Sequence, residues 1–179
     1  MSGPNIYLIG FMGTGKTTVG RCLAKKLHYR FIDSDKAIEK DEGCAAKDII
    51  KQKGLPYFRQ CEQTFIESGH PKDRCVISCG GGIITTPGTL EKLKARGLVV
   101  ALFASIDTLL ERTGRNDRRP LLQVDNPRER IEALLKERMD SYLGAHTAIL
   151  TDQRSIQDVV THVERFYQEQ SPGFKPKIS

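Results

Sequence analysis

Residues 10–17 read Gly10-Phe11-Met12-Gly13-Thr14-Gly15-Lys16-Thr17, and they match the phosphate-loop pattern G-x-x-x-x-G-K-[ST] in full. The preceding Asn5–Ile9 is a short apolar run that is typical of a buried strand. The following segment repeats apolar residues at helical spacing as far as Leu27. A chance glycine-rich turn is the alternative, but a full match between a predicted strand and a predicted helix favours a nucleoside triphosphate site.

In such a loop, backbone N–H groups wrap phosphate oxygens, and the helix N-terminus adds partial positive charge. Lys16 would reach the β- and γ-phosphates, and the Thr17 hydroxyl would ligate Mg²⁺. The nucleotide-binding residues that we expect here are Met12, Gly13, Thr14, Gly15, Lys16, Thr17 and Thr18.

The composition limits the class of protein. The 179 residues suit one domain with its own core. Five cysteines form an odd set without a C-x-x-C pair, which argues against a zinc site or a disulfide framework and favours a reducing cytosol. No segment resembles a signal peptide, and no apolar run approaches the roughly 18 residues that span a bilayer. We therefore expect a cytoplasmic protein without a membrane partner.

The formal net charge of +6 is concentrated in two segments, Arg112–Arg119 and Arg128–Arg138. Aromatic side chains do not alternate with these basic residues, as single-strand nucleic-acid binding would favour, so we expect no nucleic-acid partner. A solvated face is the ordinary explanation of such clusters. Next to a phosphate loop, we favour the interpretation that they bind phosphates and a small acid.

Two acidic residues end the next predicted strand, which runs from Arg30 to Asp35. Asp33 and Asp35 are two positions apart, so both carboxylates would point to one side, at the end of the strand where open α/β sheets bind ligands. One acid would lie near a metal ion and the other beside a substrate hydroxyl. The alternative is that Ser34 or Asp35 only caps a following helix over residues 36–42.

Residues 45–69 show a helical pattern that is broken at Gly54-Leu55-Pro56, which predicts an inserted helical hairpin. Within it, Arg59 and Glu62 are three positions apart and share one helix face. Taken alone, such a pair is more often a surface contact than a site.

A third strand is predicted over residues 75–79, and it runs directly into Gly80, Gly81 and Gly82. Consecutive glycines after a strand allow the backbone to approach a ligand closely, and a flexible turn is the alternative. Thr86-Pro87 then predicts the start of a helix, with a capping hydroxyl and proline at the first helical position.

The second half of the chain alternates in the same way. Residues 97–103 are nearly all apolar, which predicts a central parallel strand. Residues 113–122 are polar, rich in arginine and closed by proline, which is typical of a mobile loop or lid. The remaining predicted elements are a helix from Ser105 to Arg112, a helix from Asn126, a strand over 148–151, a helix from Ser155 to about Gln168 and a frayed tail over 171–179.

Strands that alternate with helices predict a parallel sheet with helices on both faces, joined by right-handed crossovers. The expected fold class is therefore α/β, a three-layer α/β/α arrangement with a five-stranded parallel sheet. The sequence contains no internal repeat and no interdomain linker, so we expect residues 1–170 to form a single domain.

Together these motifs resemble the shikimate kinase family, within the nucleoside-monophosphate-kinase-like group of phosphate-loop folds. The resemblance covers about residues 6–167, in the family's order. The combination of motifs is far more specific than any single motif. It rests on Gly10–Thr18, Phe31-Ile32-Asp33-Ser34-Asp35, Phe58-Arg59 with Glu62, Gly80–Gly82, Arg119-Pro120-Leu121-Leu122, and Arg138 followed by Tyr142.

The resemblance implies a helical substrate-binding region at about residues 34–62 and a lid at about residues 113–125 that closes over ATP. It also implies that the γ-phosphoryl group of MgATP is transferred to the 3-hydroxyl of shikimate. The products would be ADP and shikimate 3-phosphate, for aromatic amino acid biosynthesis. ATP and shikimate would be the ligands, Mg²⁺ the metal ion, and a monomer is the expected state.

The matching motifs also imply roles for residues. Asp35 would hydrogen-bond the substrate hydroxyls and take the proton of the reacting hydroxyl. The implied catalytic residues are Lys16, Asp35 and Arg119. The implied substrate-binding residues, whose arginines hold the carboxylate, are Asp35, Arg59, Gly80, Gly81, Gly82 and Arg138. The implied ATP-binding residues outside the loop are Arg112, Arg119 and Arg154, and the implied metal ligands are Thr17 and Asp33.

The sequence departs from the family pattern in the acceptor half. Gly54-Leu55-Pro56-Tyr57 stands where the family often has Gly-Glu before Phe-Arg, and Ala46 and Ile50 replace larger side chains. These departures leave open a kinase for another small hydroxy acid, such as gluconate. An ATP-binding module without acceptor activity is a further alternative, whereas a GTPase is disfavoured because the sequence lacks N-K-x-D and D-x-x-G.

Overall fold

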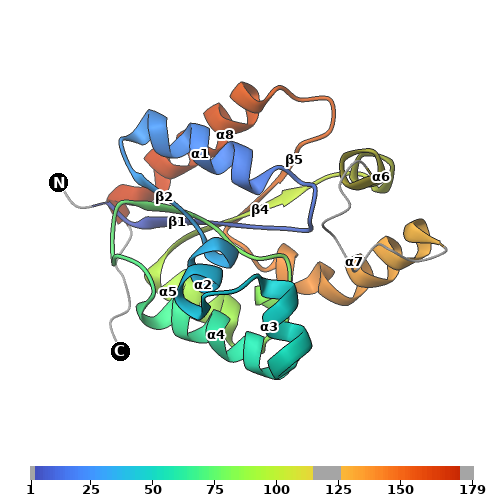
Figure 1. Ribbon diagram of the computed structural model, residues 1–179. Helices are drawn as coiled ribbons and strands as arrows, with labels where there is room; N and C mark the ends of the chain where they lie inside the picture. The colour runs from blue at the N-terminus through green and yellow to red at the C-terminus, as the bar shows by residue number, and fades with distance from the viewer. Residues whose placement is uncertain (1–2, 115–125, 174–179) are drawn as a thin grey trace.

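A computed structural model describes residues 3–114 and 126–173 of the chain. Within these residues, five strands form one sheet, and helices cover both of its faces (Figure 1). The strands are β1 Asn5–Ile9, β2 Arg30–Asp33, β3 Cys75–Ser78, β4 Gly97–Phe103 and β5 Thr147–Leu150. The helices are α1 Lys16–Leu27, α2 Ser34–Glu42, α3 Ala46–Lys53, α4 Leu55–Ser68, α5 Thr89–Arg96, α6 Ile106–Gly114, α7 Pro127–Leu143 and α8 Ile156–Gln170, with short 3-10 helices at η1 Ile83–Thr85 and η3 Ser171–Gly173.

The strands are all parallel, and they lie in the order β2-β3-β1-β4-β5. Tyr7 of β1 lies opposite Ile77 of β3 on one side and Val99 of β4 on the other. β1 is therefore the central strand, and the chain crosses over from it in opposite directions. Ligands of open α/β sheets bind at such a point, beyond the carboxyl ends of the strands. The predicted five-stranded parallel sheet and the α/β fold class are confirmed.

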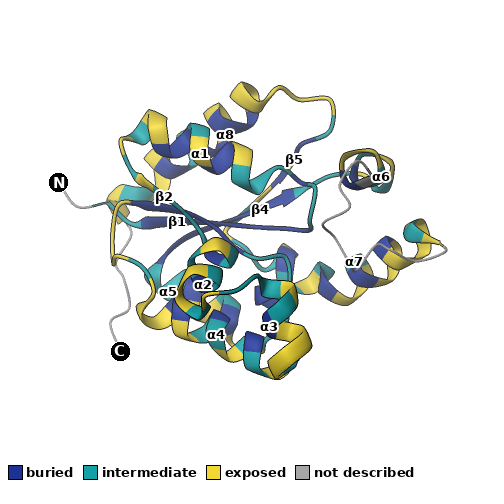
Figure 2. Cartoon of the chain, viewed as in Figure 1, coloured by how far each residue is buried: buried dark blue, intermediate teal, exposed yellow. Residues whose placement is uncertain are grey.

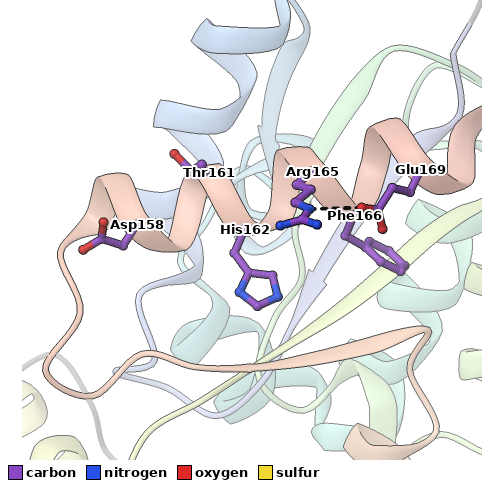
Figure 3. Close-up of a pocket in the computed structure, with 6 residues that line it drawn as sticks. All are labelled: Asp158, Thr161, His162, Arg165, Phe166 and Glu169. Atoms are coloured by element: carbon purple, nitrogen blue, oxygen red, sulfur yellow. Dashed lines mark hydrogen bonds and ion pairs between the residues drawn. The ribbon is translucent and has the colours of Figure 1, made fainter.

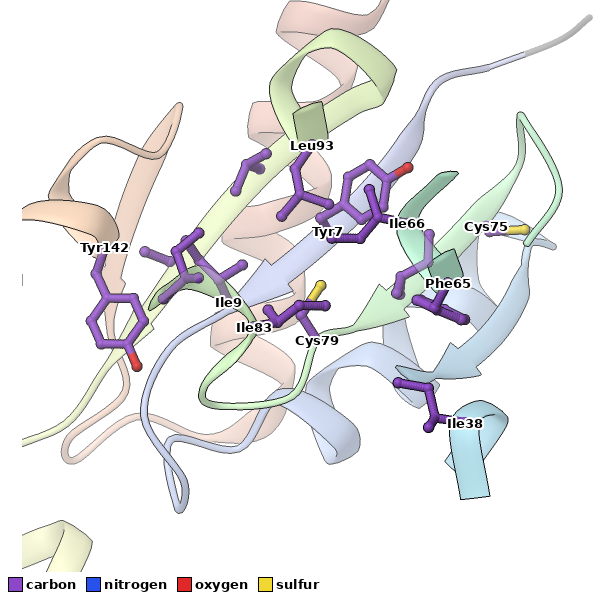
Figure 4. Packing of buried hydrophobic residues seen from close by; sticks show 14 of the residues in the cluster. Tyr7, Ile9, Ile38, Phe65, Ile66, Cys75, Cys79, Ile83, Leu93 and Tyr142 are labelled. Carbon is purple, nitrogen blue, oxygen red and sulfur yellow. The ribbon is translucent and has the colours of Figure 1, made fainter. Parts of the chain in front are cut away.

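Alternate residues of β1 contribute to two separate cores. Tyr7 and Ile9 face the side that α2–α5 and α7 cover, and Figure 4 shows this packing. Ile6 and Leu8 face the opposite side, which α1 and α8 cover. Figure 2 shows the same distribution, with buried residues on the strands and on the inner faces of the helices. Because both faces of the sheet are buried, β1 reads as a continuous apolar run instead of an alternating one.

The second strand ends earlier than the sequence predicted. β2 stops at Asp33, and Ser34 and Asp35 belong to the first turn of α2. Asp33 is the N-cap, and its carboxylate accepts a hydrogen bond from the Lys36 N–H at 3.3 Å. The alternative that Ser34 or Asp35 only caps the helix is not what the structure shows, because Asp33 before them already satisfies a free N–H group of the helix. Asp33 and Asp35 therefore do not share one strand face.

Helix α5 begins at Thr89 and not at the predicted Thr86-Pro87. The chain first forms η1, in which the Thr85 hydroxyl donates to the Gly82 carbonyl oxygen at 2.7 Å. Gly88 then adopts a φ of 79° immediately before the helix, a left-handed conformation that glycine accepts without strain. The 3-10 turn and this glycine thus delay the start of the α-helix.

The remaining predicted elements agree with the structure to within about two residues at each end. Gly54 separates α3 from α4, and the side chains of Asn126 and Ser155 cap α7 and α8. Residues 171–173 form a 3-10 helix instead of a frayed tail, whereas residues 174–179 and most of the predicted lid, residues 115–125, lie outside the described part. Across the described residues, no helix is both long and apolar enough to cross a bilayer.

Candidate active site

The phosphate loop joins β1 to α1, and its backbone requires glycine. Gly10, Gly13 and Gly15 have φ values of 138°, 86° and 95°, which residues with a Cβ atom rarely adopt. A Cβ atom at Gly10 would also overlap the Leu102 carbonyl oxygen of β4. The three glycines therefore give the loop a conformation in which successive N–H groups can face one phosphate.

Lys16 folds back over this loop. Its Nζ donates to the carbonyl oxygens of Gly10 at 2.8 Å and of Phe11 at 2.9 Å. The Thr14 hydroxyl donates to the same Phe11 oxygen at 2.8 Å, which fixes the turn from inside. The ammonium group is thus held against the loop, where the lysine of this motif meets the β- and γ-phosphates.

Thr17, Asp33 and Ser78 meet where α1 begins and where β2 and β3 end. The Thr17 hydroxyl donates to Asp33 Oδ2 at 3.1 Å and lies 3.3 Å from the Ser78 hydroxyl oxygen. The two predicted metal ligands are therefore neighbours. Mg²⁺ prefers oxygen ligands and keeps several waters and substrate phosphates, so one hydroxyl and one carboxylate suit it. No group of three or more His, Cys, Asp or Glu that could hold a metal is present in residues 3–114 and 126–173.

The glycine triplet after β3 lies directly against charged side chains. The Gly80 N–H donates to the Ser34 hydroxyl at 2.8 Å. A Cβ atom at Gly80 would overlap Asp35 Oδ1, and one at Gly82 would overlap the guanidinium of Arg59. The structure thus brings the predicted acid and the first predicted arginine to two positions of the same glycine turn. The flexible-turn alternative is therefore not needed to explain these glycines.

Helix α7 brings a second arginine to the triplet. Arg138 Nη1 donates to the Gly81 carbonyl oxygen at 3.0 Å, and the Tyr142 hydroxyl donates to the same oxygen at 3.1 Å. Arg138 is only 6% exposed. Within the described part of the chain, its Nε is buried and has no hydrogen-bond partner. A buried donor without an acceptor is costly, so the position of this nitrogen is not explained by the hydrogen bonds of the free protein.

Glu62 is buried beside Arg59. Its side chain is 1% exposed, and Arg59 Nη1 donates to Glu62 Oε2 at 2.5 Å. Burial raises the pKa of Glu62 to about 7, although the guanidinium of Arg59 acts in the opposite direction. The expectation that this pair is a surface contact is wrong, because α4 turns the shared face of these residues toward the sheet and not toward solvent.

The pKa of Asp35 is also raised. Burial is the largest cause, and the neighbouring carboxylate of Asp33 adds to it. Lys16 and Arg59 lower the pKa, but by less. In the free protein, the nearby cations therefore lower the pKa of Asp35, but burial outweighs them.

Two predicted nucleotide-binding arginines lie near the loops that follow β1 and β5. Arg112 of α6 donates from Nη1 to the Gly13 carbonyl oxygen at 3.2 Å and to the Thr151 hydroxyl oxygen at 3.1 Å. Arg154 instead lies with its Nη1 3.3 Å from Nδ1 of His162 in α8. The structure thus places Arg112 against the phosphate loop and pairs Arg154 with α8.

Three further predicted nucleotide-binding residues complete the set. Met12 is partly buried and packs on a small core that includes Leu109 of α6. Thr18 is exposed on the first turn of α1. Arg119, the predicted lid arginine, lies outside the described residues.

Two surface hollows of the described part contain none of the predicted site residues. One of about 420 Å³ lies along α8, as Figure 3 shows, and is lined by Asp158, Thr161, His162, Arg165, Phe166 and Glu169. The other, of about 600 Å³, lies between α6 and α7 and is lined by Ile106, Glu132, Leu135, Lys136, Met139 and Asp140. The candidate site is therefore defined by converging polar groups and not by the size of a hollow.

Comparisons with known proteins agree with this geometry. The family model for shikimate kinase matches residues 12–168. A shikimate kinase of Thermodesulfovibrio yellowstonii is 41% identical over 169 residues, which are 94% of this chain and 98% of that protein. A shikimate kinase of Thermus thermophilus is 43% identical over 159 residues, which are 88% of this chain and 86% of that protein. The chain belongs to the shikimate kinase family.

Solved structures of a shikimate kinase and of another small-molecule kinase share the fold. Shikimate kinase from Acinetobacter baumannii in complex with shikimate has a TM-score of 0.87 and 40% identity, covering 93% of this chain and 94% of that chain. A gluconokinase from Sinorhizobium meliloti has a TM-score of 0.61 and 17% identity over 95% and 94% of the two chains, which shows the fold alone. Membership of the family makes the chain an ATP-dependent phosphotransferase, as the resemblance implied.

Several residues around the site were not predicted. The Ser34 hydroxyl accepts a hydrogen bond from the Gly80 N–H, and the Ser78 hydroxyl is hydrogen-bonded to that of Thr17. The Thr151 hydroxyl oxygen accepts from Arg112. Ser34 and Ser78 lie at the carboxyl ends of β2 and β3. Because ligands of open α/β sheets bind there, this position could have predicted that both residues belong to the site. No local pattern marks Thr151, because its partner lies 39 residues earlier in the chain.

Proposed function

We propose that this member of the shikimate kinase family transfers the γ-phosphoryl group of MgATP to the 3-hydroxyl of shikimate. The observation that carries the proposal is the grouping of Asp35, Arg59 and Arg138 around Gly80–Gly82, close to the phosphate loop. A small acid with several hydroxyls needs guanidinium groups for its carboxylate and a carboxylate for its hydroxyls. The relative from Acinetobacter baumannii, 40% identical to this chain, binds shikimate.

The two arginines have different tasks in the proposed acceptor site. Arg138 already donates from Nη1 to Gly81, and the rest of its guanidinium group, which includes the unpaired Nε, would bind the ligand carboxylate once the site adjusts around it. Arg59 is anchored by Glu62, so its remaining N–H groups are presented toward Gly82 in one orientation. A carboxylate held by both guanidiniums would fix the ring of the acceptor, and with it the hydroxyl that is phosphorylated.

Asp35 is the group that we assign to the reacting hydroxyl. Its carboxylate lies beside Gly80, and burial raises its pKa toward the working pH. A base is more effective when its pKa is nearer the working pH, provided that it remains ionised. Asp35 would accept the hydroxyl proton as the oxygen–phosphorus bond forms.

On the nucleotide side, the loop N–H groups and Lys16 would neutralise the phosphates, and Thr17 with Asp33 would hold Mg²⁺. Bound Mg²⁺ supplies charge neutralisation and orientation of the phosphates. Arg112 and Arg154 are proposed contacts of the nucleotide, and Arg119 of the predicted lid is proposed to reach the phosphates. Closure over the substrates would exclude the water that otherwise hydrolyses ATP.

The remaining expectations are part of the same proposal. Residues 1–170 would act as one domain, with the acceptor region at about 34–62 and the lid at about 113–125. The protein would work as a cytoplasmic monomer without nucleic-acid or membrane partners. Size-exclusion chromatography with light scattering tests the monomer, and a mass near 20.1 kDa is the expected result.

The first experiment measures ADP release from MgATP with shikimate, with quinate, with gluconate and without an acceptor. Strong stimulation by shikimate alone is the expected result, and the Lys16→Ala variant should show none. If the protein binds ADP but shikimate does not stimulate ADP release, the proposed acceptor is wrong. Faster release with gluconate would support the alternative kinase and direct attention to Ala46, Ile50 and Leu55.

A further inference from the structure

The loop between β5 and α8 is tied to helix α6 at two points. Near the start of α6, Asp152 Oδ1 accepts from the Ser105 N–H at 3.0 Å and from the Thr108 hydroxyl at 2.5 Å. Toward the other end of the helix, the Thr151 hydroxyl oxygen accepts from Arg112 Nη1 at 3.1 Å. Two consecutive residues of one loop thus hold both halves of α6.

Thr151 is a rigid support for Arg112. Its hydroxyl donates to the Phe103 carbonyl oxygen at 2.9 Å, and its N–H donates to the same oxygen at 2.8 Å. Its carbonyl oxygen lies 3.5 Å from Arg112 Nη2, so both of its oxygens face the guanidinium. Thr151 is only 4% exposed, whereas Arg112 is an exposed side chain. The arginine is therefore oriented by a partner that is itself fixed to the end of β4.

The same guanidinium reaches the phosphate loop, because Arg112 Nη1 also donates to the Gly13 carbonyl oxygen at 3.2 Å. A planar guanidinium beside a phosphate loop is suited to stack on an aromatic base. An arginine that is already held in position loses less side-chain freedom when the base docks on it.

We propose that Thr151 is a positioning residue of the nucleotide site, whose hydroxyl holds the Arg112 guanidinium where the adenine base docks. Thr151 acts through Arg112 and needs no contact of its own with the nucleotide. The inference rests on the proposed function in one respect only, which is the assignment of Arg112 to ATP binding.

The test compares the binding of ADP with that of inorganic tripolyphosphate, which lacks a base, by isothermal titration calorimetry with Mg²⁺ and without an acceptor. Thr151→Val removes the hydroxyl and keeps the shape of the side chain. It should weaken ADP binding about tenfold and leave tripolyphosphate binding unchanged. Thr151→Ser, which keeps the hydroxyl, should restore ADP binding. Thr151→Ala should behave as Thr151→Val does, which removes any dependence on how the valine packs.

Thr89→Val is the matched control. Thr89 is fully buried, and its hydroxyl oxygen accepts from Gln63 Nε2 at 2.8 Å, between α4 and α5. This variant loses a comparable hydrogen bond and should bind ADP as the unmodified protein does. Equal weakening of ADP and tripolyphosphate by Thr151→Val, or no weakening of either, would overturn the proposal.

A double variant tests whether Thr151 acts through Arg112. Arg112→Ala should weaken ADP binding, and adding Thr151→Val to it should weaken binding no further. A further loss in the double variant, or unchanged ADP binding by Arg112→Ala, would also overturn the proposal. These measurements need no acceptor, so they remain decisive if shikimate is not phosphorylated. In steady-state kinetics, Thr151→Val should raise the KM for ATP and leave the KM for shikimate unchanged.

Discussion

Glu62 and Arg138 are charged residues that the fold buries on two sides of the glycine triplet. Each lacks the solvation that its type normally has, and each is held in place by a partner, Arg59 for Glu62 and the Gly81 carbonyl oxygen for Arg138. Burial of charged groups costs stability unless they are paired. Burial of these two residues therefore lowers the free energy of unfolding, and it fixes the orientation of their charged groups in the proposed acceptor site.

The first prediction concerns the pH dependence of stability. The pKa of Glu62 is raised to about 7 in the folded protein, above its usual value of about 4.3 in an unfolded chain. The folded state therefore holds this proton more tightly, and the contribution of Glu62 to stability is complete below about pH 4 and lost as the pH rises through about 7. Glu62→Gln cannot lose a proton. Its free energy of unfolding, relative to the unmodified protein, should rise between pH 5 and 7.5 by on the order of 2 kcal/mol.

Urea denaturation at both pH values measures this difference. Glu67→Gln is the control, because Glu67 lies on the same helix, is 54% exposed and pairs with Lys92. Lys92 holds the pKa of Glu67 below its usual value, so this variant should show no such rise. A rise of equal size in both variants would contradict the assignment to Glu62.

The second prediction separates acceptor binding from nucleotide binding. Arg138→Lys replaces a fork of donors by one ammonium group, which cannot hold the Gly81 oxygen and a ligand carboxylate in the same geometry. The KM for shikimate should rise roughly 10- to 100-fold, and the KM for ATP should change little. Arg130→Lys, an exposed position about two turns earlier on α7, should leave both KM values unchanged. Equal increases in both KM values for Arg138→Lys would argue against its role in the acceptor site.

Residues that belong to a local motif were predictable, and residues whose role depends on distant contacts were not. The phosphate loop was predictable because all of its chemistry lies within eight consecutive positions. The burial of Glu62 was not, because an i, i+3 pair looks the same on an outer or an inner helix face. The burial of Glu62 can be predicted only when it is known that this face of α4 packs toward the sheet.

At the level of elements, α6 depends on a residue that is remote in sequence. Asp152, which follows β5, accepts hydrogen bonds from the Ser105 N–H and from the hydroxyls of Ser105 and Thr108. These bonds lower the pKa of Asp152, so it remains ionised beside the positive end of the helix. Ser105 was correctly predicted to lie at the helix start, but the sequence does not show that an aspartate from another loop completes the cap.

The third prediction tests this cap. Asp152→Ala removes the acceptor for one N–H and two hydroxyl groups, so the free energy of unfolding should fall by about 1–2 kcal/mol. Asp107→Ala is the control, because Asp107 is 82% exposed and its ion pair with Arg128 lies in solvent. Its effect should stay below about 0.5 kcal/mol. Equal losses for the two variants in chemical denaturation would show that Asp152 is no more than a surface charge.

Helix boundaries followed from the sequence where the cap is local. Ser155 and Asp158 form a complete capping box, three positions apart, and the start of α8 was predicted from them. The start of α5 was missed because the 3-10 turn before it depends on the Gly82 carbonyl oxygen, whose position is set by β3 and the acceptor site. The end of β2 was missed because Asp33 serves both as a helix cap and as a partner of Thr17.

For the whole molecule, the alternation of strands and helices was sufficient to predict a parallel sheet with helices on both faces. The central place of β1 and the division into two cores were not predictable in the same way. They depend on which strands pair, and β1 pairs with β3 and β4, neither of which is its neighbour in sequence. Five predicted strands and the family resemblance both indicated a five-stranded sheet, but neither gave the order of the strands.

The fourth prediction concerns stabilisation of the whole fold by nucleotide. A ligand that binds only the folded state, at one hundred times its Kd, raises the free energy of unfolding by about 2.7 kcal/mol. MgADP should therefore stabilise the protein by this amount. Lys16→Ala should keep its fold, as circular dichroism would show, and lose most of this stabilisation at the same ADP concentration. Lys25→Ala, an exposed position on α1, is the control and should keep it. Full stabilisation of Lys16→Ala would refute the role of Lys16.

The central position of β1 has a consequence for how the protein is made. Ile6 pairs with Leu98, so the strand synthesised first finds one of its two partners only after roughly 90 more residues. At the usual pace of ribosomes, this interval is on the order of ten seconds. During this time the edge of β1 that pairs with β4 has no partner, and Gly10 of the phosphate loop lacks the Leu102 carbonyl oxygen against which it finally lies. The surroundings of the phosphate loop are therefore completed late in synthesis, when β4 becomes available to pair with β1.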